Sequence, residues 1–239
     1  MNVALITGGS RGFGRAVAAE LSRRGWRLVL DARGGYDLER ARTALPYPAN
    51  AVAIPGDVTD PAHRERLAEA VESAGGLDLL LNNASELGPS PLPPLSRHAL
   101  DELETVYRVN VVAPLALVQR LLPALEAAHG AVINMSSDAA VEAYEGWGGY
   151  GSSKAALDQL SAVLGTEVPA IRVYALDPGD MRTALHQRAF PGDDISDRPE
   201  PEESVPAVLR LLHERPASGR YRASDLLAVD APALVSPAS

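Results

Sequence analysis

Short apolar runs alternate along the chain with longer segments in which apolar residues recur every three or four positions. The runs are nearly continuous rather than alternating, which is typical of strands covered on both faces. They predict six strands, at Val3–Thr7, Leu28–Asp31, Ala51–Pro55, Leu77–Leu81, Ala131–Ser136 and Ile171–Leu176. The segments between them predict amphipathic helices, clearest at Ala16–Arg24, Arg64–Ser73, Leu100–Leu125 and Ala155–Leu164. This alternation favours an α/β fold, a doubly wound parallel sheet of about seven strands with helices on both faces.

The C-terminal part of the chain is less regular. Phe190–Glu203 contains six acidic residues and three prolines, which favours a solvated loop. The alternative is a lid over a substrate site, so residues 184–204 are a candidate substrate-loop region. We expect a short helix at Val205–Leu212, a final strand at Gly219–Leu226 and a frayed tail at 231–239. Because no repeat or linker divides the chain, we expect a single domain over residues 1–239.

Composition narrows the classes of function. Acidic residues outnumber basic ones 31 to 22, and the resulting net charge of −9 argues against binding to nucleic acid or anionic membranes. Cysteine is absent and the histidines show no metal-ligand spacing, so we expect no disulfide, thiolate nucleophile or metal site. The longest apolar run, Val111–Val118, is far shorter than the ~20 residues that span a bilayer. With a strand starting at Val3, the sequence predicts a cytoplasmic protein without a signal peptide.

A glycine-rich loop follows the first predicted strand and precedes an amphipathic helix. Glycines in this position let the backbone approach a pyrophosphate, and the helix N-terminus supplies free N–H groups and a positive dipole end. A plain tight turn also recruits glycine, but the strand–loop–helix context favours nucleotide binding. We therefore expect a coenzyme site lined by Gly8, Ser10, Arg11, Gly12, Phe13 and Gly14.

The end of the second predicted strand bears on which coenzyme is bound. An acid there usually accepts the ribose 2′-hydroxyl of NAD, whereas arginine suits the 2′-phosphate of NADP. Here Asp31 is followed two positions later by Arg33, which together with Arg11 can clamp a 2′-phosphate. Asp31 lies on the same face as Arg33 by period-two alternation, so it either pairs with Arg33 or caps a helix. We expect NADP(H) to be favoured over NAD(H).

Polar residues also follow the third and fourth predicted strands. Asp57, which precedes Val58, either caps the next helix or accepts a hydrogen bond from an adenine amino group. Asn82, Asn83, Ala84 and Ser85 lie at the end of the fourth strand. Because the carboxyl ends of parallel strands form the ligand edge of such a sheet, these residues belong to the same candidate site.

The chain has 22 Lys and Arg residues, and Lys154 is the single lysine among them. It lies four residues after Tyr150, so both side chains share one helical face, and Ser137 follows the fifth strand. An ammonium close to a phenol favours the phenolate and lowers its pKa from ~10, so that tyrosine can act as an acid or base. Taken singly, these residues are an exposed Tyr and Lys and an ordinary serine cap. Their combination with the glycine loop favours carbonyl–alcohol chemistry.

In these residues the chain resembles the classical short-chain dehydrogenase/reductase family, and the resemblance covers most of its length, to about Met181. The motif TGxxxGxG is matched by Thr7, Gly8, Gly12 and Gly14, and YxxxK by Tyr150 and Lys154. NNAG is matched except that Ser85 replaces its glycine, and Pro178-Gly179 corresponds to the later PG motif. The resemblance implies a Rossmann-like sheet and a dinucleotide coenzyme.

The resemblance also implies roles for individual residues. Ser137 would orient a carbonyl, Tyr150 would serve as the acid or base, and Lys154 would tune Tyr150 and hold the ribose. Asn110 would support a water that links Lys154 to solvent. Met181 and Thr183 would reach the nicotinamide amide. Family members pair through surfaces corresponding to Leu100–Leu125 and the Tyr150 helix, which implies a homodimer or homotetramer. The alternative is that the same apolar stripes pack in the core of a monomer.

Substrate contacts follow from topology alone. The loop between Ser137 and Tyr150 passes over the site, so Tyr144 and Trp147 can form an aromatic wall, with Leu185 and His186 on the other side. Ordinary packing or exposure explains each of these four residues equally well. The sequence thus predicts an NADP(H)-dependent oxidoreductase that interconverts a small-molecule carbonyl and a secondary alcohol, mainly as a reductase. The alternatives are a coenzyme-binding sensor or scaffold, and an NAD-preferring alcohol dehydrogenase.

Overall fold

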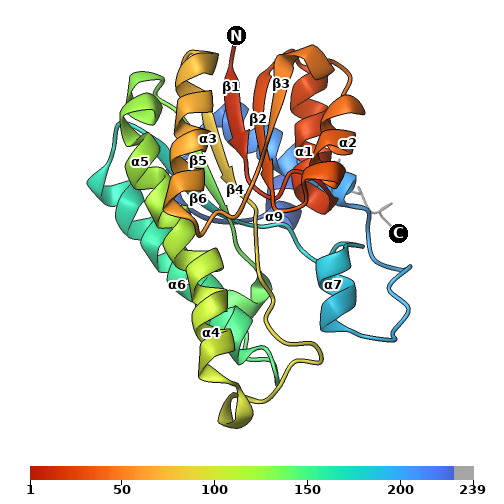
Figure 1. The fold of residues 1–239 in the computed structure, drawn as a ribbon. Helices are drawn as coiled ribbons and strands as arrows, with labels where there is room; N and C mark the ends of the chain where they lie inside the picture. Colours follow the sequence, from red (N-terminus) through yellow and green to blue (C-terminus); the bar gives the residue numbers. More distant parts are fainter. Residues whose placement is uncertain (229–239) are drawn as a thin grey trace, which may run out of the picture.

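The computed structural model describes residues 1–228, and its centre is one seven-stranded sheet (Figure 1). The strand order is β3-β2-β1-β4-β5-β6-β7, and each neighbouring pair is parallel. The strands are β1 Val3–Ile6, β2 Arg27–Ala32, β3 Ala51–Pro55, β4 Leu79–Asn82, β5 Ala131–Met135, β6 Arg172–Asp177 and β7 Gly219–Arg222. The order reverses between β1 and β4, which confirms the predicted doubly wound, Rossmann-like sheet.

Helices cover both faces of the sheet (Figure 1). They are α1 Gly12–Arg23, α2 Gly35–Thr43, α3 Pro61–Ala74, α4 Leu100–Tyr107, α5 Ala113–Ala127, α6 Gly148–Glu167, α7 Ala184–Ala189, α8 Val205–Glu214 and α9 Ala223–Ala228. Residues of α1, α2, α8 and α9 belong to one buried cluster with the sheet. Residues of α3 and α5 belong to a second cluster on the opposite face, against which Leu164 of α6 also packs. The near-continuous apolar strands are explained by this burial on both sides.

The predicted helix Leu100–Leu125 is present but consists of three parts. A π-helical turn at Arg108–Val112 joins α4 to α5, and such turns occur frequently at functional sites. Among the described residues, the helical stretch Leu100–Ala127 is the one that is long enough and apolar enough to cross a membrane, by length and composition alone. Leu117, Leu121 and Leu125 on this stretch are buried against the sheet, and 44% of its apolar window is buried in the fold.

The secondary structure differs from the sequence prediction at the last strand and at α2, and α7 was not predicted either. The strand expected at Gly219–Leu226 ends at Arg222, because Ala223–Ala228 forms α9, whose Leu226 and Leu227 pack on the core. The unpredicted helix α2 has only two buried residues, Leu38 and Ala41, so its sequence carries little apolar periodicity. The expected tail at 231–239 lies outside the described residues.

The candidate substrate-loop region, 184–204, begins with α7 and ends with a short 3₁₀ turn at Pro201–Ser204. The side chains of Glu200 and Glu203 cap this turn reciprocally. Most of the acidic residues between the two elements are exposed. The segment therefore combines a solvated stretch with two ordered elements beside the carboxyl ends of the strands (Figure 1).

Candidate active site

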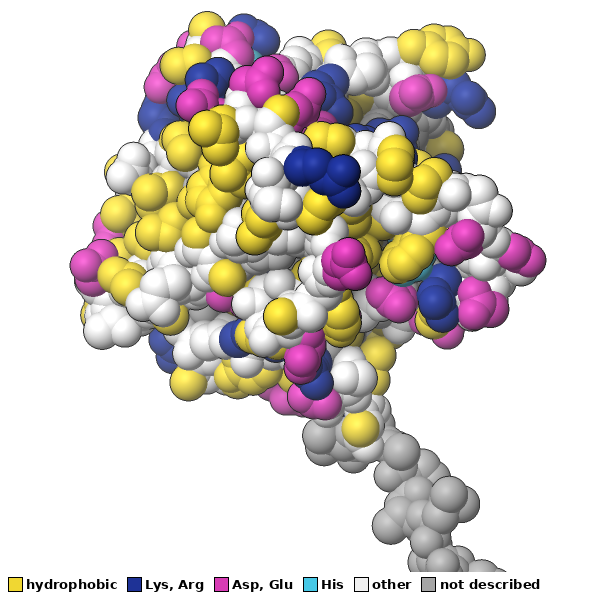
Figure 2. Space-filling view, turned by 90° about the horizontal axis from the view of Figure 1, so that it is seen from below, with side chains coloured by type: hydrophobic (Ala, Val, Ile, Leu, Met, Phe, Trp, Pro, Cys, Tyr) yellow, Lys and Arg dark blue, Asp and Glu magenta, His cyan; other side chains and the backbone are white. Residues whose placement is uncertain are grey.

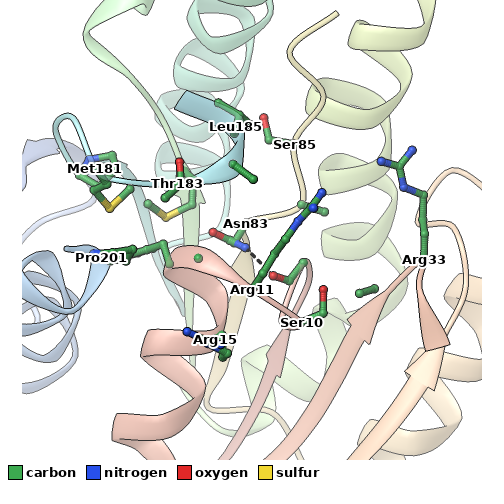
Figure 3. Close-up of a pocket in the computed structure, with 18 of the residues that line it drawn as sticks. Ser10, Arg11, Arg15, Arg33, Asn83, Ser85, Met181, Thr183, Leu185 and Pro201 are labelled. Carbon is green, nitrogen blue, oxygen red and sulfur yellow. Dashed lines mark hydrogen bonds between the residues drawn. The ribbon is translucent and has the colours of Figure 1, made fainter. Parts of the chain in front are cut away.

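A cleft of ≈ 980 Å³ opens at the carboxyl ends of the strands. It is lined by the loops that follow β1 to β6, together with α7 and Pro201-Glu202. Figure 3 shows Thr183, Leu185 and Ser85 on one side of the glycine loop and Arg33 on the other. Figure 2 looks onto this end of the molecule, where hydrophobic side chains cover much of the surface and charged ones are interspersed. The cleft lies where a doubly wound sheet binds its ligands.

The glycine loop packs tightly against the end of β4. Gly8 and Gly12 have positive φ angles of 66° and 54°, which side chains rarely tolerate. A Cβ on Gly14 would lie 2.5 Å from both the Gly8 carbonyl oxygen and the side-chain amide nitrogen, Nδ2, of Asn83. That Asn83 Nδ2 donates to the carbonyl oxygens of Thr7, at 2.9 Å, and Gly8, at 3.1 Å. Asn83 therefore fixes the loop's shape, so its function is partly structural.

The start of α1 fits a phosphate group. Its N-cap residue, Arg11, makes no side-chain cap hydrogen bond, and the first turn contains no acidic residue. The amides of this turn therefore present their positive dipole end to the cleft, beside the side chain of Arg11. Ser10 and Phe13 also line the cleft. These features fit a dinucleotide pyrophosphate.

Asp31, at the end of β2, is engaged in the core. Its Oδ1 lies 2.5 Å from Nε2 of His63 on α3, and both side chains are buried. Burial raises the pKa of Asp31, while the contact with His63 opposes the rise. The two sequence alternatives for Asp31, pairing with Arg33 or capping a helix, are therefore both wrong. The partner comes from a helix 32 residues away in the sequence, which local periodicity does not reveal.

The two arginines expected at the coenzyme both line the cleft. The side chain of Arg33 is 65% exposed, and its nearest ionic contact is Glu86 at 3.7 Å. In Figure 3, Arg11 and Arg33 both extend beyond the ends of the strands. Among residues 1–228, neither is held in a tight internal pair, which leaves both guanidinium groups able to contact an anionic ligand in the cleft.

Asp57 and Val58 also line the cleft after β3. Asp57 Oδ1 accepts hydrogen bonds from the amide and hydroxyl of Thr59, at 2.8 and 2.7 Å. The helix cap is supplied instead by Asp60, which accepts from the Ala62 amide. Asp57 is thus not the cap of α3, which leaves the adenine contact as the remaining sequence alternative.

Tyr150 and Lys154 lie together on α6, buried at the inner end of the cleft. Lys154 Nζ is 5.4 Å from the centroid of the Tyr150 ring and donates to the Met135 carbonyl oxygen at 2.7 Å. Burial lowers the pKa of Lys154 to about 8. Burial also raises the pKa of Tyr150, as do the charges of Asp177 and Asp138, while a hydrogen bond with Ser85 opposes them. The expected lowering of the Tyr150 pKa by Lys154 is therefore not found, because burial of the phenol dominates and raises that pKa.

Ser85 has a role in the site that its motif position does not indicate. Besides its hydrogen bond with Tyr150, its hydroxyl donates to Asn110 Oδ1 at 3.3 Å. The glycine that usually occupies this place has no side chain to make either contact. The extra hydroxyl therefore joins the phenol to the amide of Asn110.

Asn110 is buried in the π-helical turn, and its amide holds two segments together. Nδ2 donates to the Glu86 carbonyl oxygen at 2.8 Å and to the Ser153 hydroxyl on α6 at 2.9 Å. Oδ1 also accepts from the Glu86 amide at 2.8 Å. The side chain thus positions the loop after β4 against the helix that carries Tyr150.

Ser137 follows β5 and caps the turn Asp138–Ala140. Its hydroxyl donates to Asp138 Oδ1 at 2.9 Å and accepts from the Ala139 amide at 3.2 Å. The capping alternative is therefore present in the structure. Because a hydroxyl rotates about its C–O bond, the same group can also donate to a ligand.

The turn after β6 closes the cleft on the side of α7. The Gly179 amide donates to Asp177 Oδ1 at 3.1 Å, and Gly179 has a positive φ of 76°. Pro178, Met181 and Thr183 line the cleft. Thr183 also accepts from the His186 amide and thereby caps α7. The contact of Met181 and Thr183 with a nicotinamide amide stays a prediction.

An aromatic cluster that includes Trp147 lies beside Tyr150. Trp147 packs with its ring centroid 5.8 Å from that of Tyr150 and 6.4 Å from that of Tyr144. Leu185 adjoins the same cluster. His186 lies behind it, buried, with its ring 4.9 Å from that of Phe190 and its Nδ1 3.8 Å from Asp180. Of the four residues predicted to contact substrate, Leu185 lines the cleft and Trp147 packs on Tyr150. Tyr144 packs on Trp147 and His186 is buried behind the cluster, so substrate contact stays a prediction for all four.

Several residues that sequence reasoning missed complete the site. Leu87, Ala139, Leu92 and Phe190 belong to the apolar cluster around Tyr150. Glu86 accepts from Arg188 of α7 at 3.0 Å and lies 3.7 Å from Arg33, so one carboxylate joins the two sides of the cleft. Its position directly after Asn83-Ala84-Ser85 was an available signal. In residues 1–228, no cluster of His, Cys, Asp or Glu suits a metal ion.

Comparison with known proteins agrees with this geometry. Residues 2–194 match the family described as short chain dehydrogenase. The chain belongs to the short-chain dehydrogenase family. It is an NAD(P)-dependent oxidoreductase of that family, with a Rossmann-like fold.

Two curated relatives of the dehydrogenase show the range of activities. A rhamnolipids biosynthesis 3-oxoacyl-[acyl-carrier-protein] reductase from Pseudomonas aeruginosa is 37% identical over 186 residues, covering 74% of this chain and 72% of the relative. Sepiapterin reductase from Mus musculus is 34% identical over 201 residues, covering 78% and 77%. The differing substrates in these names mean that the family alone does not identify the substrate of this chain.

Solved structures support the nicotinamide coenzyme. A short chain dehydrogenase from Shigella flexneri, complexed with NADP, superposes with a TM-score of 0.87 at 27% identity, covering 93% of this chain and 97% of that one. A second, from Escherichia coli CFT073 and complexed with NADPH, has a TM-score of 0.86 at 28% identity, covering 93% and 96%. The same cleft in the present chain has the glycine loop and helix terminus that such a group needs.

Proposed function

We propose that this dehydrogenase is an NADP(H)-dependent carbonyl reductase that converts a small apolar ketone or aldehyde to the alcohol. The observation that carries the proposal is the buried Tyr150–Lys154 pair at the inner end of the cleft, beside the Ser85 hydroxyl. A bound nicotinamide supplies or accepts the hydride. A buried phenol adjacent to an ammonium supplies the matching proton.

The residues around the pair divide the remaining tasks. Tyr150 holds the proton to be delivered to the carbonyl oxygen, and Ser137 donates a hydrogen bond to that oxygen. Lys154 places a positive charge near the Tyr150 ring, 5.4 Å from its centroid, which favours the phenolate once the proton has left. Asn110 keeps the Ser85 loop in place against α6.

The proposed preference for NADP(H) rests on the end of β2. Asp31, the acid that would accept from the ribose 2′-hydroxyl of NAD, is held by His63 in the core. Arg33 and Arg11 line the cleft with their guanidinium groups available to a 2′-phosphate. The carboxylates of Asp31, Asp37 and Asp57 line the same cleft, so the proposed preference for the phosphorylated coenzyme rests on direct contact with these two guanidinium groups.

The proposed substrate class follows from the cluster that covers Tyr150. Leu87, Trp147, Leu185 and Phe190 form an apolar and aromatic cluster with Tyr150, and Leu185 of this cluster lines the cleft. Such a lining binds alkyl or aryl groups next to a reacting carbonyl more favourably than charged ones. We expect apolar ketones and aldehydes to be better substrates than keto acids.

The direct test is stopped-flow loss of NADPH absorbance with a panel of ketones, aldehydes and diketones. Turnover that Tyr150→Phe abolishes, with NADPH binding retained, is the expected result. Activity retained in Tyr150→Phe would overturn the assigned proton donor. Tight NADPH binding with no turnover on the whole panel would favour a coenzyme-binding sensor or scaffold.

The oligomeric state stays a prediction of a homodimer or homotetramer. Leu100, Val112 and Val163, on or beside the helices expected to pair, are exposed at 74%, 57% and 39%. Light scattering on the purified protein tests this directly, and a monomer at micromolar concentration would contradict it.

A further inference from the structure

Arg220, on the last strand of the sheet, contacts three segments that carry candidate active-site residues. Its Nε donates to Asp158 Oδ2 on α6 at 2.9 Å. Its Nη2 donates to the Ser137 carbonyl oxygen and to Asp177 Oδ2, each at 3.0 Å. One guanidinium thus links the loop after β5, the helix of Tyr150 and Lys154, and the turn after β6.

The partners of Arg220 are themselves attached to the site. Asp158 lies one helical turn after Lys154, and its Oδ2 also accepts from the Ser136 hydroxyl at 2.9 Å. The second oxygen of Asp177 accepts from the amide of Gly179, in the turn that lines the cleft. A displacement of either carboxylate is therefore transmitted to backbone beside the reacting groups.

The three side chains in these contacts are largely shielded from solvent, which strengthens the charge interactions between them. The side chains of Asp158 and Asp177 are 14% and 6% exposed, and that of Arg220 is 24% exposed. Two partly desolvated carboxylates that share one cation repel each other when that cation is removed. Lysine would not replace it fully, because a single ammonium lacks the planar fork that directs donors to several acceptors at once.

We propose that Arg220 is a positioning residue for the reaction, holding Ser137 in register with the helix of Tyr150 and Lys154. It lies behind the site and acts through the backbone of Ser137 and through two carboxylates. The inference rests on the proposed carbonyl reductase function, in which Ser137 and Tyr150 contact the same carbonyl oxygen. Hydride and proton transfer depend on this register, since small misplacements of reacting groups cost large factors in rate.

The kinetic test compares Arg220→Met with Arg220→Lys and with the control Arg222→Gln. Arg222 is two residues further along and more exposed, and it approaches Asp177 only to 3.9 Å. We expect Arg220→Met to lower kcat about 10- to 100-fold with the KM for NADPH almost unchanged. Arg220→Lys should recover part of the loss, and Arg222→Gln should match wild type. A KM increase with unchanged kcat in the Arg220 variants would overturn the proposal.

Amide hydrogen exchange provides a readout that does not depend on turnover. In Arg220→Met we expect faster exchange in residues 136–140 and 177–181, with β1 and α1 unchanged. Unchanged exchange in both segments, or a uniform increase over the whole chain, would overturn the positioning role. If Arg220→Met does not fold, Arg220→Lys is measured in its place and the same outcomes decide. If wild type reduces no carbonyl, the proposed function fails while hydrogen exchange still decides the role of Arg220.

Discussion

Asp31 and His63 form a buried contact of 2.5 Å between the end of β2 and α3, just below the coenzyme cleft. His63 Nδ1 in turn lies 3.0 Å from a guanidinium nitrogen of Arg66. The ring also packs under the turn after β3, where a Cβ on Gly56 would lie 2.3 Å from it. The pair thus ties one oxygen of Asp31, which also lines the cleft, to α3 and supports the loop that carries Asp57.

The first prediction concerns stability. His63→Leu leaves the Asp31 carboxyl buried without its partner, so the free energy of unfolding should fall by about 3–5 kcal/mol. Replacing both residues, Asp31→Leu with His63→Leu, should restore more than half of it, because no polar group is then stranded. Urea unfolding measures both. His213→Leu, an exposed histidine on α8, should change the value by about 0.5 kcal/mol or less. Equal losses in the single and double variants would contradict the pairing.

Coenzyme choice gives the second prediction. Arg33→Ala removes a charged hydrogen-bond donor to a 2′-phosphate, so affinity for NADPH should fall about 10- to 100-fold. NADH lacks that phosphate, and its affinity should change little. Tryptophan fluorescence titration with both coenzymes measures the ratio, with the exposed Arg40→Ala on α2 as the control. An equal loss for both coenzymes would remove the 2′-phosphate argument.

The third prediction tests Ser85, the residue in place of the family's motif glycine. Ser85→Gly removes the hydrogen bond that opposes the raised pKa of Tyr150. We expect kcat to fall about 5-fold, the equivalent of one net hydrogen bond, while NADPH affinity stays near wild type. Steady-state kinetics together with a coenzyme titration separate the two effects. Ser152→Ala, on the same helix as Tyr150, is a matched hydroxyl control. Unchanged kcat in Ser85→Gly would show that the hydroxyl plays no part in the reaction.

The fourth prediction is a pH dependence set by Lys154. Burial lowers its pKa to about 8, so the ammonium is lost from the free enzyme as pH rises through that value. The kcat/KM for reduction should therefore fall above about pH 8. The unfolded chain keeps its proton up to the ordinary value of 10.5, so the destabilisation from burying the charge is relieved as pH rises through this window.

Lys154→Arg is the variant that isolates the role of the ammonium. Arginine keeps the charge over the whole pH range, but its planar group does not fit the compact contact with Met135. Most of the activity should be lost, and the remainder should show no fall near pH 8. Normal turnover by this variant would contradict a specific role for the Lys154 ammonium in the reaction.

Elements with strong local signals were predictable. The predicted Ala51–Pro55 strand has its observed bounds, and the other five strands shift at their ends by one or two residues. The glycine loop, Tyr150 and Lys154 lie in the cleft as expected, because the order of strands and the spacing along one helix determine their positions. The helix α2 and the division of Gly219–Leu226 were missed, because short segments carry too few apolar positions for a period to appear.

By itself, the sequence determined the sheet, its ligand edge and the one lysine placed beside a tyrosine, since each follows from local periodicity and chain order. Only the tertiary structure decided which partners the polar groups take. His63 reaches Asp31 from α3, and the Ser85 hydroxyl contacts Tyr150. Arg220, on the last strand, joins α6 to the loop after β5 and to Asp177 at the end of β6. These contacts depend on how elements distant in sequence pack, and buried polar groups take whichever partner that packing brings within hydrogen-bond distance.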